Sequence, residues 1–199
     1  MPDRYPAIED HAVTGDLHTA ALVATDGTIG WCCLPRFDSP AVFASLLDAD
    51  RGGCFAVRSE AVRTRQLYKP GTNVLVTRFL GTGSVGEGVD FMVPRHPGSP
   101  PAHPGPLLVR RLQAVRGTVV FRITCRPAFD FGRQDHAVHA PDHGGAVFVS
   151  PGAQAEHSCT PELLHLEPDK VESTGQFTTT PHSALTRALA VNRLRRSFS

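Results

Sequence analysis

Short runs of apolar and β-branched residues, separated by clusters of Gly, Pro, Asp and Ser, recur along most of this chain of 199 residues. The clearest run is VVFRITCR at 119–126, in which apolar residues alternate with Arg and Thr. Alternation with a period of two gives a β-strand one apolar face and one polar face. Helical periodicity is scarce by comparison, so the sequence predicts an all-β, antiparallel domain.

Further runs of this kind predict many short strands, at 20–24, 27–34, 54–58, 62–68, 73–80, 85–93, 107–115, 146–150, 163–167 and 171–179. So many short strands indicate two packed layers, because a single open sheet would leave one apolar face uncovered. We therefore predict an antiparallel two-sheet β-sandwich. With 41% hydrophobic residues, the chain has enough apolar side chains to fill its core.

Two connections that contain Gly predict hairpins. Asp26-Gly27 joins the runs at 20–24 and 27–34, and Arg116-Gly117 lies inside the segment 107–126. Gly supplies the positive φ that a tight two-residue turn often requires. We expect the two strands on either side of each turn to be neighbours in one sheet.

One helix is predicted to interrupt the strands, over about 40–48. Ser39 is a favourable N-cap, and Pro40 is favourable at the first helical position. The apolar residues that follow at helical spacing are Val42, Phe43, Leu46 and Leu47.

The end of the chain differs from the rest, since 181–199 is basic and its apolar residues have loosely helical spacing. We expect a β-sandwich domain over 1–180, followed by a basic tail over 181–199 that is either helical or disordered.

The charge balance argues against two classes of partner. Lys and Arg nearly equal Asp and Glu, and the formal net charge is +1. A chain without a broad positive field does not favour nucleic acid or an anionic membrane surface. The N-terminal residues contain no apolar signal region, and no run of about 18 apolar residues occurs, so we expect a cytoplasmic protein.

The cysteines are odd in number and form no CxxC motif; they are Cys32, Cys33, Cys54, Cys125 and Cys159. This pattern favours reduced thiols packed in the core over a disulfide framework or a metal site. Consecutive residues of a strand point to opposite faces, so Cys32 and Cys33 are not expected to share a metal or a bond.

Other candidate chemistry is not supported by spacing. The segment DHAVHAPDH at 135–143 is rich in His and Asp, with Asp135, His136, His139, Asp142 and His143, but it matches no zinc signature, and we expect a polar connection without metal or other cofactor. The Gly-rich segment 81–88 opens no helix that could bind a phosphate. Ser39 lacks the nucleophile-elbow motif.

The carboxyl groups of Asp16, Asp26, Asp38, Asp90 and Asp130 lie near turns or strand ends, where bonding to backbone amides is their ordinary role. No two of them can be paired as acid and base from spacing alone. Spacing alone therefore identifies no catalytic residue in this chain.

Several ordered blocks resemble the N-terminal domain of bacterial trehalase-like and glucoamylase-like enzymes, the family-fifteen glycoside hydrolases. The blocks are YPAIEDHAVTGDLHTAALVATDGTIGWCCLPRFDSPAVFASLLDADRGGCF, TNVLVTRFL, GVDFMVP, LVRRLQAVRG and CRPAFDFGR, and they extend over about 1–180. The resemblance implies a β-sandwich of the supersandwich type, followed in the family by a toroid of paired helices that carries two catalytic glutamates.

The resemblance also implies a substrate class: α-linked glucosides such as trehalose, maltose or starch oligosaccharides, cleaved with inversion. On this interpretation the chain stops before the toroid, so its partner would be a helical catalytic domain, supplied in trans or lost. Gly30 stands where the family commonly has Asp, and Cys32 where it has Leu. Together with the basic tail, these departures favour a truncated or frame-shifted sequence.

Trp31, Arg36 and Asp38, in and before the PRFDSP segment, are the candidate contributors to a substrate pocket. Trp31 would offer a flat face to a sugar ring, and the two charged side chains would bind hydroxyl groups. The alternative is structural: Trp31 in the core, Arg36 paired with a carboxylate, and Asp38 capping the turn into the predicted helix.

Three functions are thus compared. The first is a non-catalytic domain of a trehalase-like or glucoamylase-like glycoside hydrolase. The second is a stand-alone carbohydrate-binding module with an α-glucoside ligand, for which Trp31, Tyr5 and Tyr68 are the aromatic candidates besides phenylalanine. The third is an inactive remnant, which would expose an apolar patch.

Overall fold

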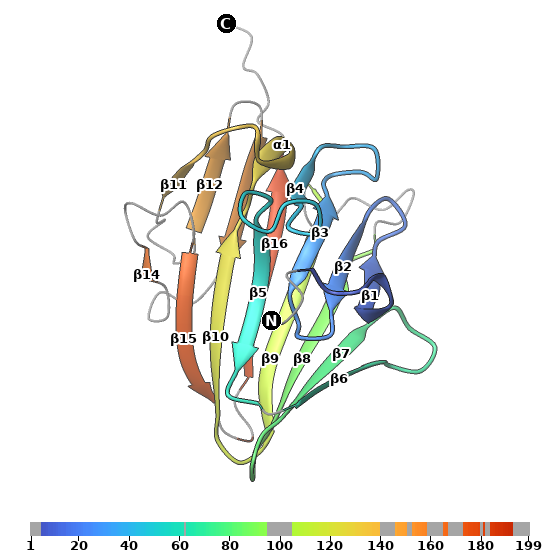
Figure 1. Cartoon of the computed structure of the whole chain (residues 1–199), viewed down its shortest axis with the longest axis vertical. Helices are drawn as coiled ribbons and strands as arrows, with labels where there is room; N and C mark the ends of the chain where they lie inside the picture. Colours follow the sequence, from blue (N-terminus) through green and yellow to red (C-terminus); the bar gives the residue numbers. More distant parts are fainter. Residues whose placement is uncertain are drawn as a thin grey trace, which may run out of the picture.

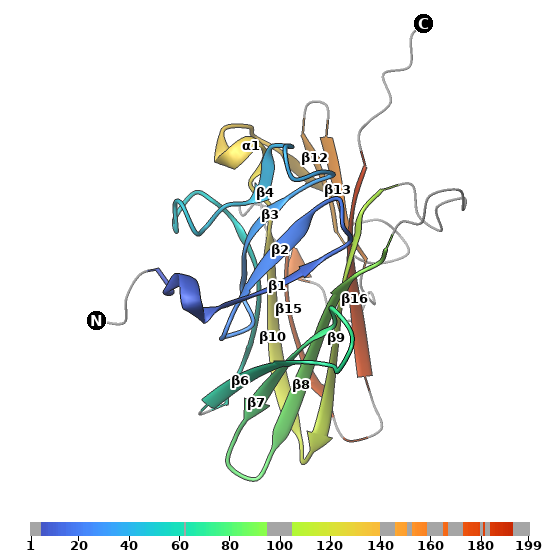
Figure 2. The same ribbon diagram turned by 90° about the vertical axis from the view of Figure 1, so that its right-hand side faces the viewer.

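A computed structural model describes residues 5–61, 63–94, 105–139, 146–150, 153–158, 165–166, 173–179, 181 and 184–192. These residues form two antiparallel sheets packed face to face (Figures 1 and 2). The prediction of an all-β, two-sheet sandwich is confirmed.

The first sheet has the order β1-β2-β3-β5-β10-β15-β14, with β4 paired to β3. Its strands are β1 (His11–Gly15), β2 (Ala20–Ala24), β3 (Ile29–Cys33), β4 (Ala41–Phe43), β5 (Cys54–Ser59), β10 (Val119–Arg126), β14 (His165–Leu166) and β15 (Ser173–Thr179). A short 3-10 helix, η1 (Ile8–Asp10), precedes β1.

The second sheet has the order β11-β12-β13-β16-β9-β8-β7-β6. Its strands are β6 (Arg63–Tyr68), β7 (Leu75–Leu80), β8 (Val85–Met92), β9 (Leu107–Arg116), β11 (Ala137–His139), β12 (Ala146–Ser150), β13 (Ala153–Ser158) and β16 (Ala184–Asn192). The α-helical element of the described residues is α1 (Phe129–Gly132), at the upper end of the sandwich in Figure 1.

The hairpin predicted at Asp26-Gly27 is confirmed, because β2 and β3 pair antiparallel and Gly27 has a φ of 87°. The hairpin predicted over 107–126 is wrong. Gly117 does have a positive φ, of 64°, but β9 and β10 belong to different sheets. The chain crosses between the layers there, so that the apolar faces of the two strands meet across the core instead of lying side by side.

The helix predicted over 40–48 is also wrong. Residues 41–43 form β4, which pairs with β3 through Cys32 opposite Phe43 and Cys33 opposite Ala41. All three residues of β4 are buried, and a strand covered on both faces reads as a continuous apolar run that resembles a short helix. Ser39 caps no helix, and its Oγ instead accepts a hydrogen bond from the Arg36 amide at 3.1 Å.

The helical alternative for the tail is wrong over 184–192. These residues form β16, which pairs with β9 on one side and β13 on the other. Residues 193–199 lie outside the described part of the chain. The separation of a domain at residue 180 stays a prediction.

The core lies between the two sheets and is rich in phenylalanine. Phe79 of the second sheet meets Phe121 of the first edge to face, with ring centroids 5.5 Å apart. The fully buried side chains that surround them include Phe43, Phe55, Phe148, Ile29, Leu75, Leu108 and Leu112. Burial of aromatic rings from both layers holds the sheets face to face.

The edge strands β1 and β6 of the two sheets are joined by a side chain. The hydroxyl of Tyr68, on β6, accepts a hydrogen bond from the Val13 amide and donates one to the Val13 carbonyl, both at 2.8 Å. Gln66 of the same strand donates from Nε2 to the carbonyl of Ala24 at 2.8 Å. At Val13, the backbone groups on the open edge of β1 are therefore hydrogen-bonded by a side chain of the other sheet, and not by a further strand.

Candidate functional site

Trp31 projects from β3 and is half-buried. It packs on a small apolar cluster of Cys33, Ala41 and Ala44, which is separate from the main core. Its ring centroid lies 6.1 Å from that of Phe131, with the ring planes inclined at 47°. Trp31 thus belongs to a second aromatic contact on the outside of the main core.

Arg36 and Asp38 pair with each other. Arg36 Nε donates to Asp38 Oδ1 at 3.1 Å, and both side chains are largely exposed, at 69% and 75%. The loop that carries them is a tight turn in which the Ser39 amide donates to the Arg36 carbonyl at 3.1 Å. The alternative role of Asp38 as a helix cap is wrong because no helix follows the loop, whereas the pairing of Arg36 with a carboxylate is observed.

Phe131 was not selected from the sequence, yet the structure places it beside Trp31. It lies in α1, where Asp130 and Phe131 have φ values of 51° and 59°, and Gly132 has 77°. This element is therefore a left-handed turn, a conformation that residues with a Cβ seldom adopt. The Phe131 ring is 39% exposed.

Backbone hydrogen bonds fix α1 to the strands beneath Trp31. The Ala128 amide donates to the Val42 carbonyl of β4 at 2.8 Å, and the Gly132 amide donates to the Ala128 carbonyl at 3.1 Å. Gly53, with a φ of 68°, lets the preceding loop approach closely, since a Cβ there would lie 2.8 Å from that of Ala128.

Two charged side chains flank the Phe131 ring. Arg133 Nη2 donates to Asp130 Oδ1 at 2.7 Å, and the Arg133 guanidinium carbon lies 5.5 Å from the ring centroid. The Arg133 and Asp130 side chains are 67% and 25% exposed. Figures 1 and 2 show α1 and the loop between β3 and β4 at the same end of the sandwich.

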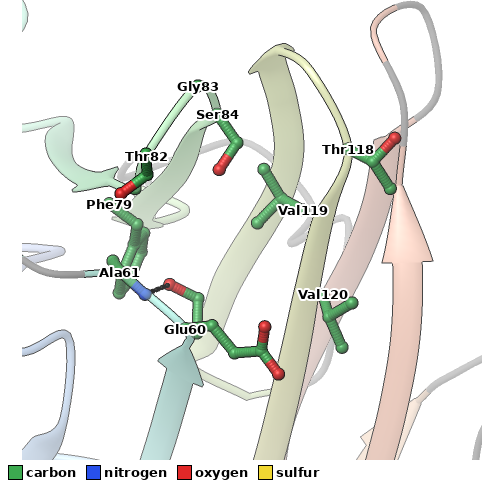
Figure 3. A pocket seen from close by; sticks show the side chains of 11 residues that line it. Glu60, Ala61, Phe79, Thr82, Gly83, Ser84, Thr118, Val119 and Val120 are labelled. Carbon is green, nitrogen blue, oxygen red and sulfur yellow. Dashed lines mark hydrogen bonds between the residues drawn. The ribbon is translucent and has the colours of Figure 1, made fainter.

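A pocket of about 420 Å³ opens at the other end. Figure 3 shows the turn residues Thr82, Gly83 and Ser84 on one side, with Val119 and Val120 of β10 across from them. Glu60 and Thr118 add polar groups to the rim, and the buried Phe79 lines the pocket as well. The Gly81 amide donates to the Ser84 carbonyl at 2.9 Å and closes the connection between β7 and β8.

The described part of the segment 135–143 is built around His136. Its ring contacts Phe129 and Phe148 edge to face, at centroid distances of 5.3 and 5.7 Å. Asp142 and His143 lie outside the described residues. In the part of the chain that the structure describes, no group of three His, Cys, Asp or Glu side chains converges as a metal site would.

Cys32, Cys33, Cys54 and Cys125 form no disulfide bond, and Cys159 lies outside the described residues. Burial raises the pKa of the Cys32 thiol, and neighbouring Cys33 and Asp16 add in the same direction. Burial also raises the pKa of Cys33. Since the thiolate is the reactive form, neither residue is suited to nucleophilic or redox chemistry.

The carboxyl groups singled out from the sequence have structural partners. Asp16 accepts hydrogen bonds from the amides of His18 and Thr19, and Asp26 accepts one from Thr28. The remaining three, Asp38, Asp90 and Asp130, pair with Arg36, Arg110 and Arg133. Each of these five carboxylates is thus engaged by backbone amides or by an arginine.

Comparison with known proteins identifies the class. A model of the family described as "Trehalase-like, N-terminal" matches residues 2–155. This chain belongs to that family. Over 153 residues it is 37% identical to a trehalase of Thermoplasma volcanium, with 73% of this chain and 23% of the relative covered.

Two further relatives agree. A trehalase of Mycolicibacterium smegmatis is 31% identical over 145 residues, covering 65% of this chain and 21% of the relative. Trehalase 1 of Sulfolobus acidocaldarius is 31% identical over 160 residues, covering 79% of this chain and 25% of the relative. The chain thus matches about a fifth to a quarter of the length of these curated relatives.

Proposed function

We propose that this β-sandwich is the non-catalytic N-terminal domain of a glycoside hydrolase that acts on α-glucosides such as trehalose. The observation that carries the proposal is the family match over 2–155, together with relatives that are themselves named trehalases. The resemblance to glucoamylase-like enzymes extends the substrate class to maltose and starch oligosaccharides.

The proposed role is to support and complete an active site whose acids belong to another domain. Glycoside hydrolysis uses two carboxyl groups about 5–9.5 Å apart, one of which must give up a proton to the leaving oxygen. Asp16, Asp90 and Asp130 are each engaged by backbone amides or by an arginine. We therefore assign both catalytic carboxyl groups to a helical catalytic domain, the proposed partner of this one.

Trp31, Arg36 and Asp38 are the residues proposed to border the substrate pocket of that partner. The exposed Arg36–Asp38 pair and the half-buried Trp31 ring support this role, because both are accessible at one end of the sandwich. Hydroxyl groups of a glucoside can accept from the guanidinium and donate to the carboxylate.

The test is glucose release. The chain alone should release no glucose from trehalose or maltose. The second protein in this test is a fragment of the Thermoplasma volcanium trehalase. It contains the part of that enzyme outside the 23% that this chain matches. Adding this chain to that partner should raise its turnover or its thermal unfolding temperature. Turnover by the chain alone that disappears when one of its own carboxylates is changed to an amide would overturn the proposal, as would a partner that is indifferent to the added chain.

A cytoplasmic location is part of the proposal. It is supported by four cysteines that form no disulfide bond, Cys32, Cys33, Cys54 and Cys125, because cytoplasmic cysteines are kept reduced. Among the described residues, none of the helical segments is long and apolar enough to cross a bilayer. Cell fractionation with a thiol-labelling step checks the assignment, and recovery of the protein outside the cytoplasm would contradict it.

A further inference from the structure

We infer that Trp31 and Phe131, together with the Asp130–Arg133 ion pair, form a binding surface for one pyranose ring of a neutral α-glucoside. We call this set of four residues the aromatic surface. The inference takes its substrate class from the proposed function, but it assigns ligand binding to this domain itself. It draws on Phe131 and Arg133, which were not selected from the sequence, and on Asp130, which the sequence offered only as a carboxylate near a turn.

The first observation is the presentation of the Phe131 ring. Two consecutive residues with a Cβ, Asp130 and Phe131, hold left-handed backbone angles. Such a conformation persists only where the surroundings impose it, and it concentrates at ligand sites. Here this backbone conformation leaves the apolar Phe131 ring 39% exposed to solvent, although a buried ring would stabilise the fold more.

The second observation is the relation of the two rings. Their centroids are 6.1 Å apart and their planes are inclined at 47°, so they form an open angle instead of a parallel stack. A pyranose ring has an apolar face of C–H groups, which can pack on an aromatic ring while its edge carries hydroxyl groups. Ligand sites commonly combine such apolar contact with a few placed polar groups.

The third observation supplies the polar groups. Arg133 and Asp130 are paired at 2.7 Å, and the guanidinium lies 5.5 Å from the Phe131 centroid. A carboxylate accepts from hydroxyl groups and a guanidinium donates to them, so the pair suits the neighbouring hydroxyls of a sugar. The pair carries no net charge, and this favours a neutral ligand over an anionic one, which Asp130 would repel.

The chain offers a direct readout, because Trp31 is its single tryptophan. Intrinsic fluorescence of the full chain, titrated with trehalose and with maltose, should change saturably. Saturation-transfer NMR on the sugar protons is the second measurement, and it does not depend on the environment of Trp31.

The decisive variant is Phe131→Asn. Asn tolerates the left-handed backbone better than other residues, so this change removes the ring while keeping the turn. We expect the dissociation constant to rise by roughly tenfold. Asp130→Asn keeps the turn and removes the charge, and it should weaken binding as well. Phe131→Ala is the second ring deletion, with far-UV circular dichroism as the check on folding.

Two control variants separate the site from general effects. Phe37→Ala removes a ring that is 63% exposed and outside the aromatic surface, and Glu60→Gln changes the pocket at the opposite end. Both should bind as the unchanged chain does. Equal binding in Phe131→Asn and the unchanged chain would overturn the inference, and so would the absence of saturable signal in both measurements with either α-glucoside.

These outcomes are distinct from those of the glucose-release test. Sugar binding that is lost in Phe131→Asn, without any effect of the chain on the partner's turnover, would support the inference and contradict the proposed function. A chain that raises the partner's turnover but shows no sugar signal would support the proposed function and contradict the inference.

Discussion

Arg110 and Asp90 form a bidentate ion pair inside the sandwich. Nε of Arg110 donates to Oδ1 of Asp90 at 2.7 Å, and Nη2 donates to Oδ2 at 3.0 Å, with each side chain only 2% exposed. Nη1 also donates to the Phe55 carbonyl at 2.6 Å, and Nη2 to the carbonyl of Gly27. An arginine of the second sheet therefore binds two backbone carbonyls of the first.

Removing one partner of this pair should strongly destabilise the domain. Arg110→Met leaves the Asp90 carboxylate buried without its cation, and we expect a loss of about 3–5 kcal/mol in the free energy of unfolding. Urea denaturation measures it. The matched control is Arg78→Met, because Arg78 pairs with Glu87 at 2.8 Å on the same sheet but is 50% exposed. That change should cost less than about 1 kcal/mol. Similar losses in both variants would contradict the special role of the buried pair.

Gly53 and Gly71 separate the effect of backbone conformation from that of crowding. Their φ values are 68° and 71°, so any residue with a Cβ is strained at both. A Cβ at Gly53 would lie 2.4 Å from the Arg126 carbonyl oxygen, whereas one at Gly71 would meet nothing within 4 Å. Gly71→Ala should cost about 1–2 kcal/mol, and Gly53→Ala clearly more. Thermal unfolding of the two variants checks the order, and equal losses would contradict it.

Local alternation predicted the strands well and their partners poorly. β2 and β10 have the predicted bounds, 20–24 and 119–126. For β10 the reason is its period-two alternation, which is a property of one strand with one covered face. The apolar face against which a strand packs belongs to residues that are distant in the sequence, so the strand's own pattern does not identify it. A Gly turn after β9 fits both a hairpin and a crossing between the two sheets. The crossing is favoured because it buries the apolar face of β9 against the apolar face of β10. β4 was missed because a fully buried run has no alternation.

The candidate site was predicted in part, for a similar reason. Trp31 and the loop around Arg36 are recognisable because a single tryptophan beside a Pro-bounded polar turn is a rare local pattern. Phe131 gave no such signal. Its left-handed backbone opposes the preference of its own residue type, so it depends on the fixed turn, which the hydrogen bond from the Ala128 amide to the Val42 carbonyl of β4 holds in place.

Tyr68 should control the local stability of β1. Tyr68→Phe removes the hydroxyl that binds both the amide and the carbonyl of Val13. We expect a loss of about 1 kcal/mol in the free energy of unfolding. Hydrogen exchange should show faster exchange at the Val13 amide, with the amides of β10 as the internal reference. Unchanged protection of Val13 would show that the hydroxyl is dispensable.

The buried thiol of Cys32 should make the domain less stable at alkaline pH. Burial raises the pKa of Cys32 in the folded state, and Cys33 and Asp16 add to this effect. In the unfolded chain a cysteine has a pKa of about 8.5. Above that pH the unfolded chain binds fewer protons than the folded one, so the free energy of unfolding falls as pH rises. The contribution of this thiol is present below about pH 8.5 and is lost progressively above it, by up to about 1.4 kcal/mol per pH unit.

Urea denaturation in the presence of a reductant, at intervals from pH 7.5 to 10, measures this slope. Cys32→Ala removes the titrating group, so the variant should show a shallower decline than the unchanged chain, whatever its stability at pH 7.5. Cys54→Ala is the matched control, because Cys54 is only half-buried and its removal should leave the slope close to that of the unchanged chain. The slope of the free energy of unfolding against pH depends on how many more protons the folded state binds than the unfolded state. Equal slopes for all three proteins would therefore mean that the Cys32 thiol does not cause the loss of stability at alkaline pH.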